Sequence, residues 1–94
     1  MLFRSRLEES NLQGSDLSGV VMDVTELRGA NMKRVKLARA SLQGADLTDA
    51  DLTEADLTDA DLSGANLSQT ILRDAKLDGV NWSQAIMPSG KQND

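Results

Sequence analysis

The sequence predicts an all-β solenoid, a chain wound into stacked coils, on three regularities that share a period of five residues. The first is a large apolar residue at every fifth position from Leu2 to Met87, and all fourteen leucines fall in this series. The second is a small residue two positions earlier, a series that contains nine of the ten alanines. The third is a position two residues after the leucine, which six of the seven glycines occupy.

A period of five fits neither a helix nor a flat strand. On a helix, successive leucines would be about 140° apart and would form no apolar face, and on a strand they would alternate between the two faces. The spacing of two between the small residue and the leucine does suit a short extended piece with both side chains on one side. The glycine that follows can take the positive φ of a turn at little cost. We therefore expect coils with the small and large positions inward and the other three positions outward.

The composition of the chain argues against catalysis and metal binding. The 94 residues carry a net charge of −5 and include no His and no Cys, so the usual general base and the usual metal ligands are missing. A serine nucleophile would need an adjacent base, and no histidine is present to act as one. Acid–base catalysis by paired carboxylates needs a shared pocket, whereas these carboxylates are expected on convex outward faces. Asp49-Ala50-Asp51 superficially suggests calcium, but Ala50 would face inward. We therefore expect that the chain is not an enzyme and that it has no catalytic, cofactor-binding or metal-binding residue.

The unit small–polar–Leu–polar–Gly/polar resembles the A(D/N)LXX consensus of the pentapeptide-repeat family. Five consecutive units reproduce it: Ala45–Asp49, Ala50–Glu54, Ala55–Asp59, Ala60–Gly64 and Ala65–Gln69. The resemblance implies a right-handed quadrilateral β-helix with four pentapeptides per coil, about four and a half coils here. Residues 1–88 would form this β-helix, and residues 89–94 a short disordered tail. The charge pattern alone favours a coil of twenty residues over fifteen or twenty-five without deciding it.

Twenty residues per coil would align outward side chains in columns. One column reads Asp16, Lys36, Asp56 and Lys76, and three further pairs of opposite charge would stack: Glu8 with Arg28, Arg34 with Glu54, and Arg39 with Asp59. Exposed pairs of this kind contribute about 0–1 kcal/mol each. We expect them to steady the stack and to disfavour slipped registers.

The charge is uneven along the chain. Residues 22–41 have a net charge of +3 and residues 42–61 one of −7. The leading interpretation is a non-enzymatic structural or protein-interaction solenoid with an unidentified protein partner and no direct binding of nucleic acid. The alternative comes from the resemblance, because some family members imitate DNA and bind DNA gyrase. The basic residues Lys33, Arg34, Lys36 and Arg39 interrupt the acidic surface that such mimicry requires.

The ends of the stack are the largest apolar surfaces that the pattern leaves. Trp82, Ile86 and Met87 gather at the C-terminal end, where the Trp82 ring either covers the last coil or forms a contact patch. We expect a weak homodimer through this end, with the N-terminal end around Leu2 and Phe3 as the second choice. Three outward apolar residues, Val21, Val24 and Ile71, are interpreted as incidental. No apolar run could span a membrane and no leader is recognised, so a cytoplasmic protein without membrane contact is expected.

Overall fold

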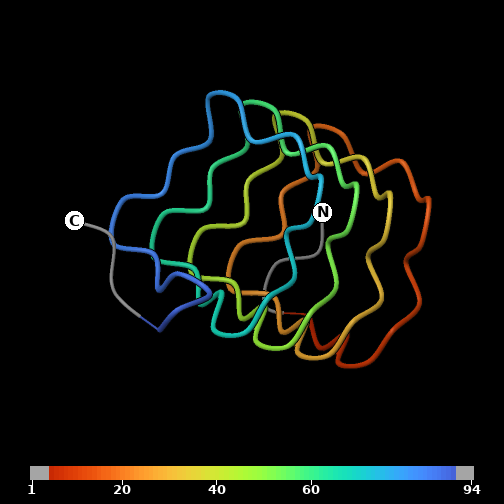
Figure 1. Cartoon of the computed structure of the whole chain (residues 1–94), viewed down its shortest axis with the longest axis horizontal. Coiled ribbons are helices and arrows are strands. Elements are labelled where there is room, and N and C mark those ends of the chain that lie inside the picture. The colour runs from red at the N-terminus through yellow and green to blue at the C-terminus, as the bar shows by residue number, and fades with distance from the viewer. Residues whose placement is uncertain (1–4, 91–94) are drawn as a thin grey trace.

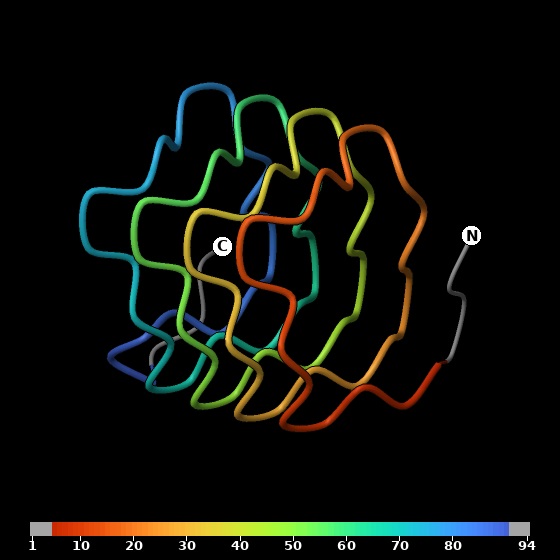
Figure 2. The same ribbon diagram turned by 90° about the vertical axis from the view of Figure 1, so that its right-hand side faces the viewer.

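The computed structural model describes residues 5–90, and in it the chain winds into similar coils stacked one on another (Figures 1 and 2). Each five-residue unit contributes one residue to parallel β-bridges, which run from Arg6↔Glu26 to Asn66↔Ile86. All thirteen bridges join residues twenty apart in the sequence. One coil therefore contains four five-residue units, the size that the family resemblance implies.

The pairing between coils is of the β type, but the described residues contain isolated bridges and no continuous strand or helix. The reason is the shortness of each side, since only one residue pairs before the chain turns. Backbone hydrogen bonds nevertheless join every coil to its neighbours. Around Leu47, the N–H of Leu47 donates to Asn66 O at 2.7 Å, and Asp49 N–H donates to Ser68 O at 3.0 Å. Asp51 N–H reaches the opposite neighbour, Ala30 O, at 3.0 Å.

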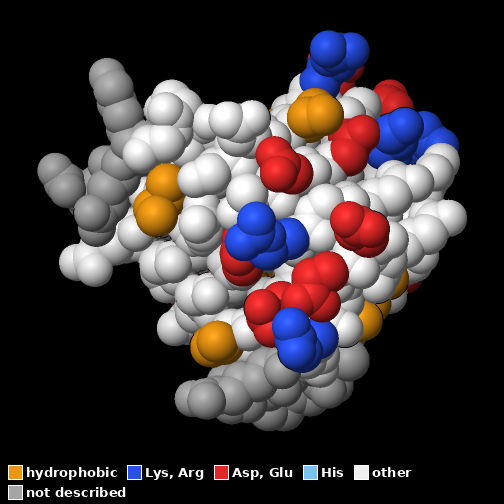
Figure 3. Space-filling model, turned by 90° about the horizontal axis from the view of Figure 1, so that it is seen from below, with side chains coloured by type: hydrophobic (Ala, Val, Ile, Leu, Met, Phe, Trp, Pro, Cys, Tyr) orange, Lys and Arg blue, Asp and Glu red, His pale blue; other side chains and the backbone are white. Residues whose placement is uncertain are grey.

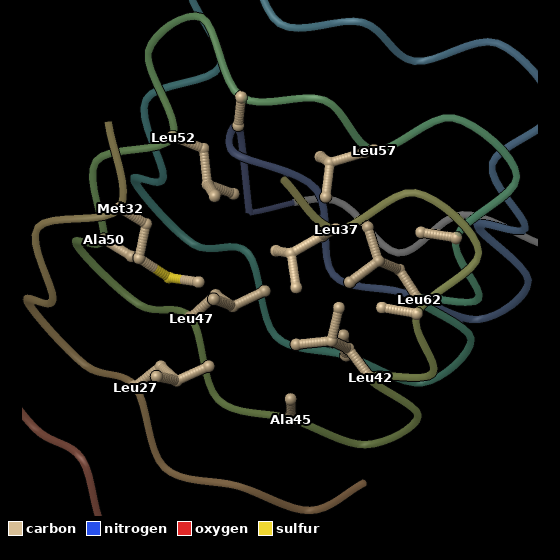
Figure 4. Packing of buried hydrophobic residues seen from close by; sticks show 14 of the residues in the cluster. Leu27, Met32, Leu37, Leu42, Ala45, Leu47, Ala50, Leu52, Leu57 and Leu62 are labelled. Carbon is tan, nitrogen blue, oxygen red and sulfur yellow. The ribbon is translucent and has the colours of Figure 1, made fainter. Parts of the chain in front are cut away.

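The two inward registers of the sequence pattern form the core, as predicted. In the large register, every side chain from Met22 to Leu67 is at most 1% exposed. The small register between Ala30 and Ala65 is equally buried, and Figure 4 shows leucines and alanines of successive coils pointing into one column. Thr70 is a polar member of the small register, and its hydroxyl donates to Leu47 O at 2.7 Å. The hydrogen bond lets a hydroxyl lie in an aliphatic interior.

Towards both ends the same registers are only partly buried. Leu7, Leu12 and Leu17 in the first coil pack against the core from one side, as do Leu72 and Leu77 in the last. Ser89 and Gly90 continue the last turn, in which Gly90 N–H donates to Met87 O at 2.7 Å. The expected N-terminal contact at Leu2 and Phe3, and most of the expected tail, lie outside the described residues.

Candidate functional site

The corners of each coil lie two residues after the leucine, where the sequence places its glycines. Every residue of this register from Glu9 to Gln84 has a positive φ, and ten of these residues are not glycine. At a representative corner, Asp49 has a φ of 62° and the turn closes with a 2.9 Å bond from Ala50 N–H to Leu47 O. The glycine prediction is confirmed and extends further, because the pairing between coils imposes the same turn on every residue type.

The Asp and Asn residues immediately before the leucines cap these turns. The Oδ1 atom of Asp56 accepts hydrogen bonds from Thr58 N–H at 3.0 Å and from the Thr58 hydroxyl at 2.6 Å. A side-chain-to-backbone bond of this kind is an Asx turn. Its backbone bond recurs at Asn11, Asp16, Asn31, Asp46, Asp51, Asp56, Asp61, Asn66 and Asn81, which are all the Asp and Asn residues of this register within residues 5–90.

The sequence pattern predicts only that these side chains face outward, and it does not predict their capping role. The signal that could have revealed it is the Ser or Thr that often stands two residues after the Asp or Asn, as in Asp51-Leu52-Thr53. At Ser41 the cap comes from another coil. Asp23 Oδ1 accepts from the Ser41 hydroxyl at 2.6 Å and from Gln43 N–H at 3.0 Å.

The charged columns are partly as predicted. Bridges align Asp16, Lys36, Asp56 and Lys76, and Arg34 pairs with Glu54 at 3.5 Å. Two of the expected pairs are wrong, since Arg28 pairs with Asp46 at 3.8 Å instead of Glu8, and Arg39 forms no ion pair with Asp59. Lys33 repeats the diagonal contact of Arg28 by approaching Asp51 at 3.8 Å.

The diagonal contacts have a simple physical reason. A long basic side chain just after the large apolar residue, Leu27 or Met32, reaches the capping carboxylate of the next coil, eighteen residues on. Glu8 is already engaged, because it accepts from Arg6 at 3.5 Å within its own unit. Directly stacked pairs also form, since Arg6 pairs with Glu26 at 3.1 Å and Arg34 with Glu54 at 3.5 Å, so the stack holds both kinds of contact.

Three capping aspartates have lowered pKa values. The hydrogen bond from the Thr53 side chain is the main cause that lowers the pKa of Asp51 below its ordinary 3.8, with Lys33 and Arg73 adding to it. The pKa of Asp56 is lowered by Thr58 first and then by Lys76 and Arg39. Ser18 does the same for the pKa of Asp16, with a smaller contribution from Lys36. Donors and cations both favour the charged form.

A comparison with known families decides where this architecture belongs. The family model described as pentapeptide repeats matches eight copies over residues 2–37 and 36–74. The chain belongs to the pentapeptide-repeat family. No significant match is found among proteins with curated descriptions.

Two solved pentapeptide-repeat proteins from cyanobacteria share this fold. Rfr23 from Cyanothece 51142 is 34% identical with a TM-score of 0.87 over 88% of this chain and 56% of its own. The protein alr5209 from Nostoc Pcc 7120 is 39% identical with a TM-score of 0.77 over 80% of this chain and 64% of its own. The chain thus spans less than two thirds of the length of either protein.

The acidic band of this pentapeptide-repeat chain, residues 42–61, is not a continuous negative surface. Asp46, Asp51 and Glu54 within it face Arg28, Lys33 and Arg34 of the preceding basic band. Figure 3 shows acidic and basic side chains interspersed on one face. The basic band therefore neutralises part of the acidic band through contacts between coils.

The described part of the pentapeptide-repeat chain has no concave site. No cavity or pocket is found on residues 5–90, and no group of three or more His, Cys, Asp or Glu side chains there could hold a metal ion. No helix in these residues has the length and apolar character needed to cross a bilayer. What this part of the solenoid presents to other molecules is its outward columns.

Proposed function

We propose that the protein is a non-enzymatic solenoid that acts as a structural or protein-interaction module through its outward columns. The observation that carries the proposal is that each five-residue repeat is divided into two inward and three outward positions. Two registers fill a mostly aliphatic core, and the other three form columns on a surface without a cavity in the described residues. Solenoids of stacked repeats commonly bind partners with such extended surfaces.

The finer features of the fold that belong to this proposal come from the family resemblance. They are the right-handed sense of the winding and a stack of about four and a half coils. Both would give each side of the stack a column of four or five residues. A column of that length favours recognition of an extended protein surface over a small molecule.

The absence of catalysis is also part of the proposal. The capping aspartates, which would be the first candidates for acid–base chemistry, already accept bonds from their own turns, as Asp51 does from Thr53 at 3.0 and 2.6 Å. The lowered pKa of Asp51 makes it a weaker base than an ordinary carboxylate. General acid–base work requires the opposite shift, towards neutral pH.

Affinity capture from the native cell lysate tests the proposed function. We expect a protein that is retained in constant ratio to the bait and displaced by excess untagged chain. A variant with both Asp49→Asn and Asp59→Asn is a suitable comparison, because these exposed corner residues form no cap or ion pair within residues 5–90 and Asn tolerates a positive φ. Failure to retain any protein specifically under low-salt and physiological-salt conditions would contradict the proposal.

The alternative is that the acidic band binds a DNA-handling enzyme such as DNA gyrase. The ion pairs with Arg28, Lys33 and Arg34 weaken this alternative by reducing its charge. A gyrase supercoiling assay with the protein titrated in distinguishes the two. We expect no inhibition, whereas strong inhibition at low micromolar concentration that salt and the Asp49→Asn, Asp59→Asn variant both relieve would establish the alternative.

A further inference from the structure

One side of the solenoid carries charged residues that form no ion pair within the described part of the chain. It consists of residues 15–19, 35–39, 55–59 and 75–79, which the bridges between residues 16, 36, 56 and 76 stack on one another. We call it the Lys36 side. All ion pairs within residues 5–90 lie on other sides of the solenoid. The Lys36 side nevertheless has seven charged residues: Asp16, Lys36, Arg39, Asp56, Asp59, Lys76 and Asp78.

The charges of the Lys36 side are available to another molecule. Lys36, Arg39 and Lys76 are exposed, and they attract the neighbouring aspartates only from a distance. Asp56 uses Oδ1 to accept both hydrogen bonds from Thr58, which leaves its Oδ2 atom for an outside cation. A surface with matching charges therefore gains ion pairs here without breaking an existing one.

The order of charges on the Lys36 side matches itself when it is reversed. The capping column alternates in sign from Asp16 to Lys76, so reversal places a lysine opposite every aspartate. The corner column, residues 19, 39, 59 and 79, has one basic and one acidic member, and reversal places Arg39 opposite Asp59. The column between them has one charged member, Asp78, and otherwise short side chains that let two such surfaces approach. The Lys36 side is thus complementary to a reversed copy of itself.

We propose that the Lys36 side binds the same side of a second copy of this chain, with the two stacks running in opposite directions. The two-fold axis crosses this side between the coils of Lys36 and Asp56. Each copy then places Lys36 opposite Asp56 of the other copy, and Arg39 opposite Asp59 of the other copy. The remaining residues of the capping column face each other in the same way. A two-fold contact closes the assembly at a dimer.

Other arrangements place like charges opposite each other. A slip by one coil brings Asp56 opposite Asp56, or Lys36 opposite Lys36. Stacks that run in the same direction bring the capping column opposite the corner column, so that Lys36 meets Arg39 and Asp56 meets Asp59. Juxtaposed like charges are costly and fix the register of a contact. A polyanion such as nucleic acid would meet four carboxylates among the three cations, so its charge does not match this side.

The inference rests on the proposed role as an interaction module and names one partner for it. Because the contact consists of ion pairs between surface side chains, it should be weak at physiological salt and stronger at low salt. Sedimentation equilibrium of the purified chain, up to several hundred micromolar, measures the association. We expect a monomer–dimer equilibrium whose dissociation constant rises at least about tenfold between about 0.01 M and about 0.15 M salt.

Charge reversal at the corners tests the geometry. Arg39→Asp leaves two acidic corners opposite each other and Asp59→Arg leaves two basic ones, so each should raise the dissociation constant at least about tenfold at low salt. The two substitutions shift the net charge in opposite directions, so an effect of net charge cannot explain both losses. Both should fold, because Asp49 and Arg34 already occupy corners with φ values of 62° and 56°. Asp49→Arg is the matched control in the same register and coil, and it should dimerise like the wild type.

An equimolar mixture of Arg39→Asp and Asp59→Arg provides the decisive measurement. One chain has two acidic corners and the other has two basic ones, so the heterodimer regains the ion pairs that each homodimer has lost. A fluorescent label on the Arg39→Asp chain should show association restored to about the wild-type level. Mixed instead with Asp49→Arg, which has the same net charge as Asp59→Arg, the labelled chain should associate at least about tenfold less tightly.

Three outcomes would each overturn the proposed dimer: a strictly monomeric wild type at low salt, equal losses in Asp49→Arg and Asp59→Arg, or a complementary mixture that stays monomeric. Growth beyond dimers would contradict the two-fold contact. Circular dichroism and melting temperatures verify that each variant is folded. Lysate capture with the Arg39→Asp bait tests the proposed function separately, because this variant is expected to be monomeric. Retention of another protein by a chain that never dimerises would refute the homodimer alone.

Discussion

At the scale of single residues, each turn of the solenoid imposes two conformational requirements. The corner residue must adopt a positive φ, and the residue before the leucine must supply an oxygen for the turn. Asp, Asn and Gly tolerate or favour these conformations, which is why they supply about half of the residues at these two positions. Val24 is the clearest departure, since it is β-branched, 44% exposed and held at a φ of 59°.

Replacing Val24 with Asn should stabilise the protein. A β-branched residue in the left-handed region is strained by about 1–2 kcal/mol, and Asn relieves most of that strain. We expect a gain of about 1 kcal/mol in the free energy of unfolding, measured by urea denaturation. The reverse test is Gly64→Val, because a Cβ at Gly64 meets no atom closer than 3.9 Å and the loss reports the backbone alone. Equal stability of Gly64→Val and the wild type would show that these corners are unstrained.

The capping role of Asp56 predicts a difference between two substitutions. Asp56→Ala removes the acceptor for both Thr58 donors and should cost about 1 kcal/mol, as loss of comparable caps does. Asp56→Asn keeps an oxygen in the same place and should cost less. Denaturant unfolding of both variants at pH 7 measures the two losses. An equal loss would mean that charge, not the hydrogen bonds, holds this turn.

At the scale of the five-residue element, position in the stack decides what a residue contributes. A unit in the middle has a coil on each side, whereas a unit in the last coil has only one among the described residues. The leucine register shows this directly, since Leu57 is fully buried and Leu77, twenty residues later, is only partly so. The same residue type in the same register therefore has different energetic consequences.

Leu57→Ala should destabilise the protein by about 2–5 kcal/mol, because it leaves a cavity in the packed column. Leu77→Ala is the matched control, and its loss should be smaller by at least about 1 kcal/mol because part of its surface is already exposed. Thermal unfolding followed by circular dichroism measures both. Losses of equal size would indicate that Leu77 is covered as completely as Leu57.

In the small register, we expect a larger side chain, instead of a smaller one, to destabilise the protein. Ala55 is fully buried, and Ala55→Leu would force three additional carbon atoms into the packed core. Overpacking of this kind costs about 1–3 kcal/mol. A melting temperature unchanged by Ala55→Leu would contradict the inward assignment of this register, and Ala38→Leu, which lies outside it and is only partly buried, provides the control.

At the scale of the whole molecule, the sequence specifies the core and leaves the surface contacts open. The inward registers could be predicted because burial depends only on the period of five. The sequence could not predict that residues 5–90 contain isolated bridges instead of continuous strands. That difference arises because only one residue pairs on each side of a coil before the chain turns. The pairing of Arg28 with Asp46 instead of Glu8 depends on side-chain reach between coils.

The acid response of the stack follows from its capping aspartates. The pKa values of Asp16, Asp51 and Asp56 are lowered in the folded protein by their Ser and Thr donors and by nearby Lys and Arg. A group whose pKa is lower when folded stabilises the protein above its unfolded pKa, here 3.8, and this contribution disappears as the pH falls through the folded value. We therefore expect the free energy of unfolding to decrease steadily below about pH 4.

Replacing all three aspartates with Asn separates this effect from general acid denaturation. The asparagines keep an acceptor for each turn but cannot be protonated, so the triple variant should be less stable than the wild type at pH 7 and lose less stability on going to pH 3. Urea unfolding at the two pH values measures the difference. An identical loss in wild type and variant would show that the acid sensitivity comes from other carboxylates.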